Sequence, residues 1–260
     1  MPDRITSTLL QNRLLIENIG RFEAGDKCNG SGCRLNADIS DRHAMGCPHV
    51  GPVGRRGGRS HTHEVLRGLV HDLLSFSGVG FDPQDLTTHK GIIKRLKEAN
   101  AIPLGVQGLH KGGDILSLNV MKEPGQIMGD EMALDVTVTS KLGTPQDPLS
   151  CLKSEEERKH GLYAPMYDKI GVDTVGLAMD TSGNMGPNLV KLIEKCNEFR
   201  GVAWANHLPP WSTWRCRTFK SAWVSRFVVT MQIAAASKLN YVAASVARTR
   251  ARGLVLGDVG

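Results

Sequence analysis

The sequence predicts a mixed fold of the α/β or α+β class, in which helices flank a small mixed sheet. Two observations predict it. Segments with helical periodicity alternate with segments rich in β-branched or apolar residues, and turn-forming residues separate them. The hydrophobic content of 40% is also enough for a core, which must be mainly aliphatic because aromatic residues are sparse. In the middle of the chain, a helix at residues 62–77 and an ambiguous region at 78–110 come first. Strands at 114–121 and 134–140, a helix at 150–168, a strand at 172–180 and a helix at 187–199 follow.

Two helix patterns precede the predicted strands. Residues 6–18 predict a short amphipathic helix. Residues 62–77 predict a longer one, with apolar side chains at helical spacing at Val65, Leu66, Leu69, Val70, Leu73 and Leu74. The ambiguous region that follows contains one further short helix pattern, GIIKRLKEAN.

The next predicted unit is a β-hairpin with a long loop. Residues 114–121 read DILSLNVM, and residues 134–140 read LDVTVTS, in which valine and threonine alternate. A turn-rich segment with Pro-Gly at its centre lies between them. Asp114 and Asp135 stand at the starts of these strands, although aspartate is depleted in strands.

Helices dominate the C-terminal part of the chain. For the helix at residues 150–168 the sequence suggests Ser150 or Ser154 as the cap, acidic residues near the start, and Pro165 as an end or a kink. A further helix begins with Pro187 in its first turn. Residues 212–249 are largely helical, with basic residues along one stretch and at the end, at Arg248, Arg250 and Arg252.

The composition limits the partners that the chain is expected to have. The net charge of +6 favours an anionic partner such as a nucleic acid. No apolar run is long enough for a membrane span, and the N-terminus does not resemble a secretory signal. We therefore expect an intracellular protein with reduced thiols, in which cysteines serve metal binding more than disulfides.

Four metal-ligating residues have the spacing C-x4-C-x9-H-x3-C. Three thiolates and one imidazole make a closed tetrahedral zinc shell, and the residues are Cys28, Cys33, His43 and Cys47. His49 is an alternative ligand to His43, and unrelated cysteines on a loop remain the other interpretation. The Gly-rich stretch that follows has two interpretations. It contacts nucleic-acid phosphates through Arg55, Arg56 and Arg59, or it serves only as a flexible connector.

Acidic and basic residues in the predicted hairpin and the next helix suggest hydrolytic chemistry. Asp114 and Asp135 are oxygen ligands of the kind that Mg²⁺ prefers, although two strand-edge aspartates in solvent are the simpler alternative. Lys159 shares a helix face with Glu155 and Tyr163. A solvated Glu–Lys pair is the ordinary interpretation, but beside a metal the lysine can orient a water molecule or stabilise charge on a phosphate.

The order of these features resembles a known family. The layout resembles that of the PD-(D/E)xK nuclease core: an aspartate, a strand, a turn, a second aspartate that opens the next strand, and a lysine on the following helix. The chain more specifically resembles the restriction-like endonuclease region that follows the reverse transcriptase in some non-LTR retrotransposons. The matching segments are the C-C-H-C cysteine motif, THEVLRGL, GGDIL, ALDVTVTS and SEEERKHGLY, and VGLAMDTSGNMGP resembles the apolar strand and Gly-rich turn beyond the core.

The resemblance implies a restriction-endonuclease-like core with a zinc module before it. The implied activity is Mg²⁺-dependent cleavage of DNA, with RNA as the other nucleic-acid partner, in the nucleus. Asp114 and Asp135 would hold Mg²⁺, Lys159 would be the catalytic lysine, and the cysteine module would hold Zn²⁺. Auxiliary roles would fall to Glu64, Lys141, Glu155 and Tyr163. The reverse transcriptase is absent from this chain.

The same resemblance suggests a domain division and an alternative function. We expect an N-terminal helix at residues 1–24 and a zinc module with its linker at 25–60. The nuclease-like core follows at 61–200, and a C-terminal helical extension at 201–260. Two departures stand out: Thr137 replaces the lysine of the simple D-x-K motif, and Gly113 replaces the proline before the first aspartate. The alternative function is therefore an inactive nucleic-acid-binding relic of such a domain.

Overall fold

The structure is a computed structural model that describes residues 61–82, 90–101, 113–122, 130–139, 147–200 and 218–257. Several predictions lie outside these ranges. They are the N-terminal helix, the zinc ligands Cys28, Cys33, His43 and Cys47, the linker arginines Arg55, Arg56 and Arg59, and Lys141. The core of the predicted fold and the three proposed catalytic residues lie inside them.

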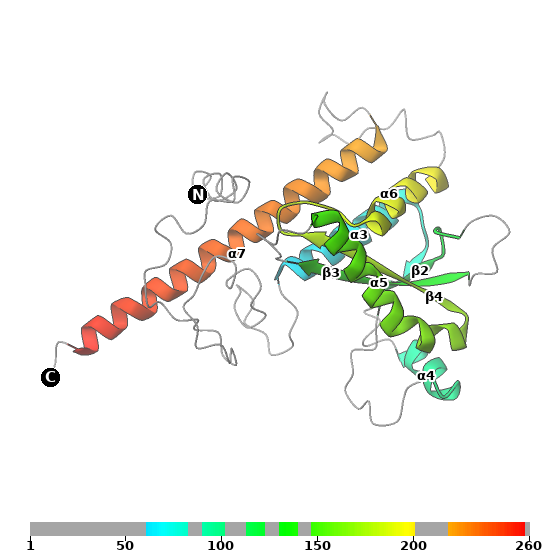
Figure 1. The fold of residues 1–260 in the computed structure, drawn as a ribbon, viewed down its shortest axis with the longest axis horizontal. Helices are drawn as coiled ribbons and strands as arrows, with labels where there is room; N and C mark the ends of the chain where they lie inside the picture. The colour runs from blue at the N-terminus through cyan, green and yellow to red at the C-terminus, as the bar shows by residue number, and fades with distance from the viewer. Residues whose placement is uncertain are drawn as a thin grey trace.

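A four-stranded mixed sheet organises the described residues, with the strands in the order β1-β2-β3-β4 (Figure 1). The strands are β1 (Phe81–Asp82), β2 (Ile115–Leu118), β3 (Glu131–Thr139) and β4 (Val172–Asp180). The first three strands pair antiparallel, whereas β3 and β4 pair parallel. The mixed α/β class, the small mixed sheet and the β2–β3 hairpin are therefore confirmed.

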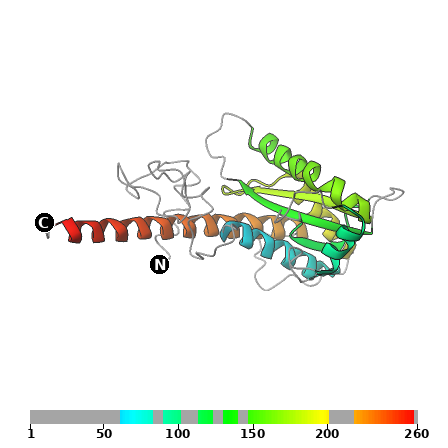
Figure 2. The same ribbon diagram turned by 90° about the horizontal axis from the view of Figure 1, so that it is seen from below.

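One face of the sheet is covered by α3 (His61–Ser77), α6 (Pro187–Arg200) and the first part of α7 (Phe219–Gly257). Figure 2 shows α3 and α7 below the sheet and α5 above it. The main apolar cluster lies on the α3 side, where Leu66, Leu134, Trp223 and Phe227 are fully buried. The larger of the two apolar clusters therefore lies between these helices and the sheet.

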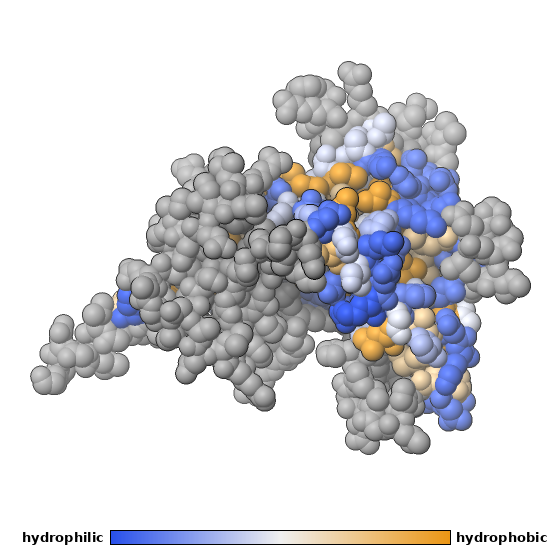
Figure 3. Space-filling view, viewed as in Figure 1, coloured by the Kyte–Doolittle hydropathy of each residue, from blue (hydrophilic) through white to orange (hydrophobic). Residues whose placement is uncertain are grey.

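The opposite face is covered by α5 (Pro148–Tyr167) and, at one end, by α4 (Lys90–Glu98). A smaller apolar cluster lies here, with Leu96, Leu116, Ala133 and Tyr167 among its members. A short 3₁₀ turn, Asp168–Ile170, leads from α5 into β4. The outward side of α5 is mostly hydrophilic (Figure 3).

The start of α5 differs from the sequence prediction. The start of α5 is capped by Asp147, whose carboxylate accepts from the backbone amides of Leu149 and Ser150, with Pro148 in the first turn. Because the helix begins earlier, its acidic residues lie in its middle and not at its start. Pro165 lies inside the helix, which continues to Tyr167.

The long helix α7 contributes to the core as well as extending from it. Trp223, Phe227 and Met231 from its first turns are fully buried against the main cluster. Its later turns extend away from the sheet (Figure 1). Among the described residues, no helix is both long and apolar enough to cross a membrane.

Candidate active site

Asp114 and Asp135 lie opposite each other on neighbouring strands. Ile115 pairs with Leu134, so the antiparallel register brings Asp114 opposite Asp135 one step further. Both carboxylates are buried, with 4% of Asp114 and 6% of Asp135 exposed. The Val136 amide donates to Oδ2 of Asp114 over 3.0 Å. The predicted pairing of two acids in one region of the sheet is therefore present, although Asp135 is the fifth residue of its strand and not the first.

Lys159 reaches this pair from α5. Its Nζ lies 2.7 Å from Oδ2 of Asp135 and 5.5 Å from the centre of the Tyr163 ring, one turn later on the helix. Tyr163 is itself buried at this position. The helix therefore brings a cation to the acids, and it also supplies an aromatic ring beneath the lysine ammonium.

The electrostatics of the acids depend on their burial and on each other. Burial raises the pKa of the Asp135 carboxyl above its usual value. The ammonium of Lys159 opposes this shift, and the negative charge of Asp114 adds to it. Carboxylate oxygens are ligands of the kind that Mg²⁺ prefers, and a bound divalent cation would relieve the repulsion between the two acids. Within the described ranges, no group of three or more His, Cys, Asp or Glu side chains is arranged to hold a metal ion.

His63 is a site residue that the sequence reasoning did not select. Its Nε2 lies 3.2 Å from Oδ2 of Asp114, and its Nδ1 lies 3.6 Å from Glu64. Glu64 also lies 3.6 Å from Nε of Arg67 and is more exposed. Glu64, the predicted auxiliary residue, is therefore one step further from Asp114 than His63. The position of His63 at the start of a helix was visible in the sequence, but its partner in the hairpin was not.

Glu156 is the second residue that sequence reasoning did not select. It is fully buried, and its carboxylate accepts from the amides of Ala178 and Asn188. Burial raises its pKa to about 7, although backbone amides that donate to it oppose the shift. The neighbouring acid Glu155, the other predicted auxiliary residue on this helix, pairs with Arg158 near the surface.

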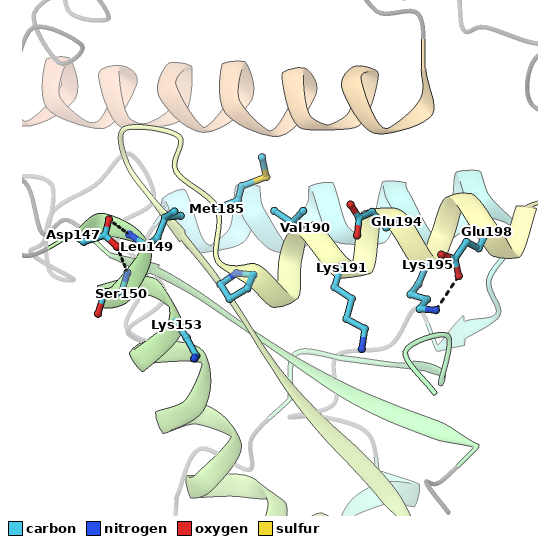
Figure 4. Close-up of a pocket in the computed structure, with 11 residues that line it drawn as sticks. Asp147, Leu149, Ser150, Lys153, Met185, Val190, Lys191, Glu194, Lys195 and Glu198 are labelled. Atoms are coloured by element: carbon cyan, nitrogen blue, oxygen red, sulfur yellow. Dashed lines mark hydrogen bonds and ion pairs between the residues drawn. The ribbon is translucent and has the colours of Figure 1, made fainter. Parts of the chain in front are cut away.

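A hollow of about 870 Å³ lies elsewhere, between the start of α5 and α6 (Figure 4). It contains none of Asp114, Asp135 and Lys159. Three lysines and three acids line it, so their formal charges cancel. The charged lining residues are Lys153, Lys191, Lys195, Asp147, Glu194 and Glu198. A groove for a polyanion would have excess positive charge, and this hollow is therefore not assigned to the nucleic acid.

Comparison with known proteins does not assign the chain to a family. No protein-family model, no curated protein and no solved structure matches it. Function must therefore be inferred from the residues and their geometry.

Proposed function

We propose that this protein is a Mg²⁺-dependent DNA endonuclease derived from a non-LTR retrotransposon and acting in the nucleus. One observation carries the proposal. A lysine ammonium from α5 lies 2.7 Å from one of two buried acids that face each other across a β-hairpin. This arrangement agrees with the order of Asp, strand, Asp, strand and helical lysine that suggested a PD-(D/E)xK nuclease core.

Each residue has a distinct task in this proposal. Asp114 and Asp135 would hold Mg²⁺, which, when bound, polarises a phosphate and lowers the pKa of a water molecule. The Lys159 ammonium stabilises the negative charge that develops on the phosphate oxygens. His63 orients Asp114 through its Nε2, and the Tyr163 ring helps to hold the Lys159 ammonium in place. The hairpin makes the acids rigid, which keeps the positioning cost low during the reaction.

The same proposal assigns the N-terminal part of the chain to nucleic-acid binding. Structural Zn²⁺ would be held by Cys28, Cys33, His43 and Cys47, and phosphates would be contacted by Arg55, Arg56 and Arg59. Metal analysis of the purified protein tests the zinc site. About one equivalent of zinc is expected for a closed four-ligand site, and less than about half an equivalent contradicts it.

Nicking of supercoiled plasmid in the presence of Mg²⁺ tests the activity. The wild type should nick the plasmid, and Asp135→Asn should lower the rate by about 100-fold or more, because it removes a metal-binding charge. Asp168→Asn is the matched control, since Asp168 is exposed at the end of α5 and should leave the rate unchanged. Equal nicking by the wild type and Asp135→Asn would contradict the assignment.

A second candidate is an inactive relic that binds nucleic acid without cutting it. Two observations favour it: Thr137 stands where the simple motif has lysine, and the described residues add no third ligand to the two acids. In this case the wild type would not nick the plasmid, but it would bind duplex DNA with an affinity that falls steeply with salt. The same preparations therefore distinguish the two candidates.

A further inference from the structure

A buried carboxylate joins three elements directly beside the proposed catalytic lysine. Glu156 belongs to α5 and is 1% exposed. Its Oε1 accepts from the Ala178 amide of β4 over 3.1 Å, and its Oε2 accepts from the Asn188 amide of α6 over 3.0 Å. Asn188 is the second residue of α6, so the carboxylate lies at the positive end of that helix. Glu156 therefore connects α5, the strand β4 and the start of α6.

Two glycines provide the space for this connection. A Cβ atom built at Gly186 would overlap the Glu156 carboxylate itself. A Cβ atom at Gly176 would lie 2.6 Å from the backbone oxygen of Glu156, closer than such atoms approach in proteins. Because that oxygen belongs to the helix backbone, it cannot rotate away. The absence of a side chain at Gly176 therefore lets this turn of α5 lie directly on β4, and its absence at Gly186 leaves room for the carboxylate.

The same contact determines the position of the Lys159 Cβ atom relative to β4. Gly176 is the register partner of Asp135 across the β3–β4 pair. A Cβ atom at Gly176 would also lie 3.0 Å from Cβ of Lys159. Lys159 follows Glu156 by three residues, so both side chains lie on the same side of the helix. The turn that Glu156 anchors is thus the turn that places the lysine above Asp135.

We propose that Glu156 is a positioning residue, which holds the Lys159 turn of α5 against β4 and so keeps the ammonium on Asp135. Glu156 itself is buried and does not touch the substrate. The expected effect on catalysis rests on the proposed nuclease function. The position of Lys159 can be measured even if the protein has no nuclease activity.

Three variants of the full chain test this role. Glu156→Ala removes the carboxylate, and Glu156→Gln keeps its shape and one acceptor oxygen. Glu157→Ala is the matched control, because Glu157 is the next residue, is exposed and pairs with Lys153 at the surface. The exposure of the Lys159 amine is measured by labelling with an amine-reactive ester and mass spectrometry, and the nicking assay supplies kcat and KM.

Glu156→Ala should increase the labelling of Lys159 several-fold, and Glu157→Ala should leave it at the wild-type level. The kcat for nicking should fall by about 10- to 100-fold in Glu156→Ala with little change in KM, because a small misplacement of a catalytic group is costly while the substrate contacts remain. Glu156→Gln should restore part of both values. Unchanged labelling of Lys159 in folded Glu156→Ala would overturn the proposal. If Glu156→Ala does not fold, Glu156→Asp takes its place, because its shorter side chain cannot reach both the Ala178 and the Asn188 amides. Unchanged labelling of Lys159 in that variant overturns the proposal.

The two readouts separate this inference from the nuclease proposal. If the wild type does not nick DNA but Glu156→Ala exposes Lys159, the nuclease proposal fails and the positioning role stands. If the wild type nicks DNA but Lys159 labelling is unchanged in Glu156→Ala, the positioning role fails and the nuclease proposal stands.

Discussion

The two faces of the sheet differ in chemistry although the same strands supply both. On β3, Met132, Leu134 and Val136 face the apolar cluster under α3 and α7, whereas Ala133 and Asp135 face α5. The main cluster of the first face consists of apolar side chains, while the second face buries a carboxylate with its lysine partner. Burial of apolar area fixes the strands in place from one side. The other side can then hold charged groups at defined positions, at a cost in stability that the apolar face must offset.

The largest expected effect breaks the apolar face. Trp223→Ala should lower the free energy of unfolding by about 4 kcal/mol, because a fully buried aromatic side chain is replaced by a cavity. Chemical denaturation measures this change. Val229→Ala on the same helix is the control; 53% of Val229 is exposed, and the change should be within about 0.5 kcal/mol. Similar losses from both variants would mean that the first turns of α7 do not belong to the core.

The second prediction breaks the close contact on the charged face. Gly176→Ala should destabilise the fold by about 3 kcal/mol, because its methyl group meets the backbone of α5. It should also reduce nicking, since α5 can no longer bring Lys159 to Asp135. Gly161→Ala on α5 is the control, because nothing lies within 4 Å of a Cβ there. That substitution should be neutral or slightly stabilising, and an identical result for Gly176→Ala would disprove the contact.

The third prediction uses pH to sharpen the comparison. The pKa of Glu156 is raised from 4.5 to about 7 in the folded protein, so the folded state binds the proton more tightly than the unfolded state does. Its contribution to stability is therefore largest below the unfolded pKa and is lost as the pH rises toward 7. We expect a loss of about 3 kcal/mol across this window.

Urea denaturation at several pH values measures this contribution. The wild type should lose stability relative to Glu156→Gln as the pH rises, because glutamine does not titrate. Comparing the two proteins cancels the titration of His61 and His71, whose pKa values are lowered by burial. A stability difference that does not change between pH 4.5 and 7 would contradict the raised pKa.

The smallest expected effect concerns the surface of the same helix. Arg158 pairs with Glu155 at 2.9 Å, but Arg158 is solvent-exposed. Arg158→Ala should therefore change the free energy of unfolding by less than about 0.5 kcal/mol and leave nicking unchanged. Lys159→Met, one residue later, should abolish most nicking, because it removes the ammonium that forms the buried pair with Asp135. Thermal unfolding and the plasmid assay measure both variants, and equal effects at the two positions would contradict the difference in burial.

Local patterns in the sequence predicted most of the elements. The helix at His61–Ser77, the β2–β3 hairpin and the strand Val172–Asp180 follow from periodicity and turn residues that act over a few positions. The meeting of Asp114 and Asp135 was also predictable, because a hairpin brings its strands together whatever the rest of the chain does. The start of α5 was predicted less well: the sequence suggested Ser150 or Ser154, although Asp147 followed by Pro148 is itself a local start signal.

By itself, therefore, the sequence determined the order of helices and strands and the two acids of the hairpin, because these depend on short-range periodicity and pairing. Only the tertiary structure decided that Lys159 lies on Asp135, that His63 lies beside Asp114 and that Glu156 is buried. The partners in these contacts are far apart in the chain, and their meeting depends on how closely α5 and α3 approach the sheet. For α5, that approach depends on the missing side chain of Gly176, an effect that appears only when helix and strand are packed together.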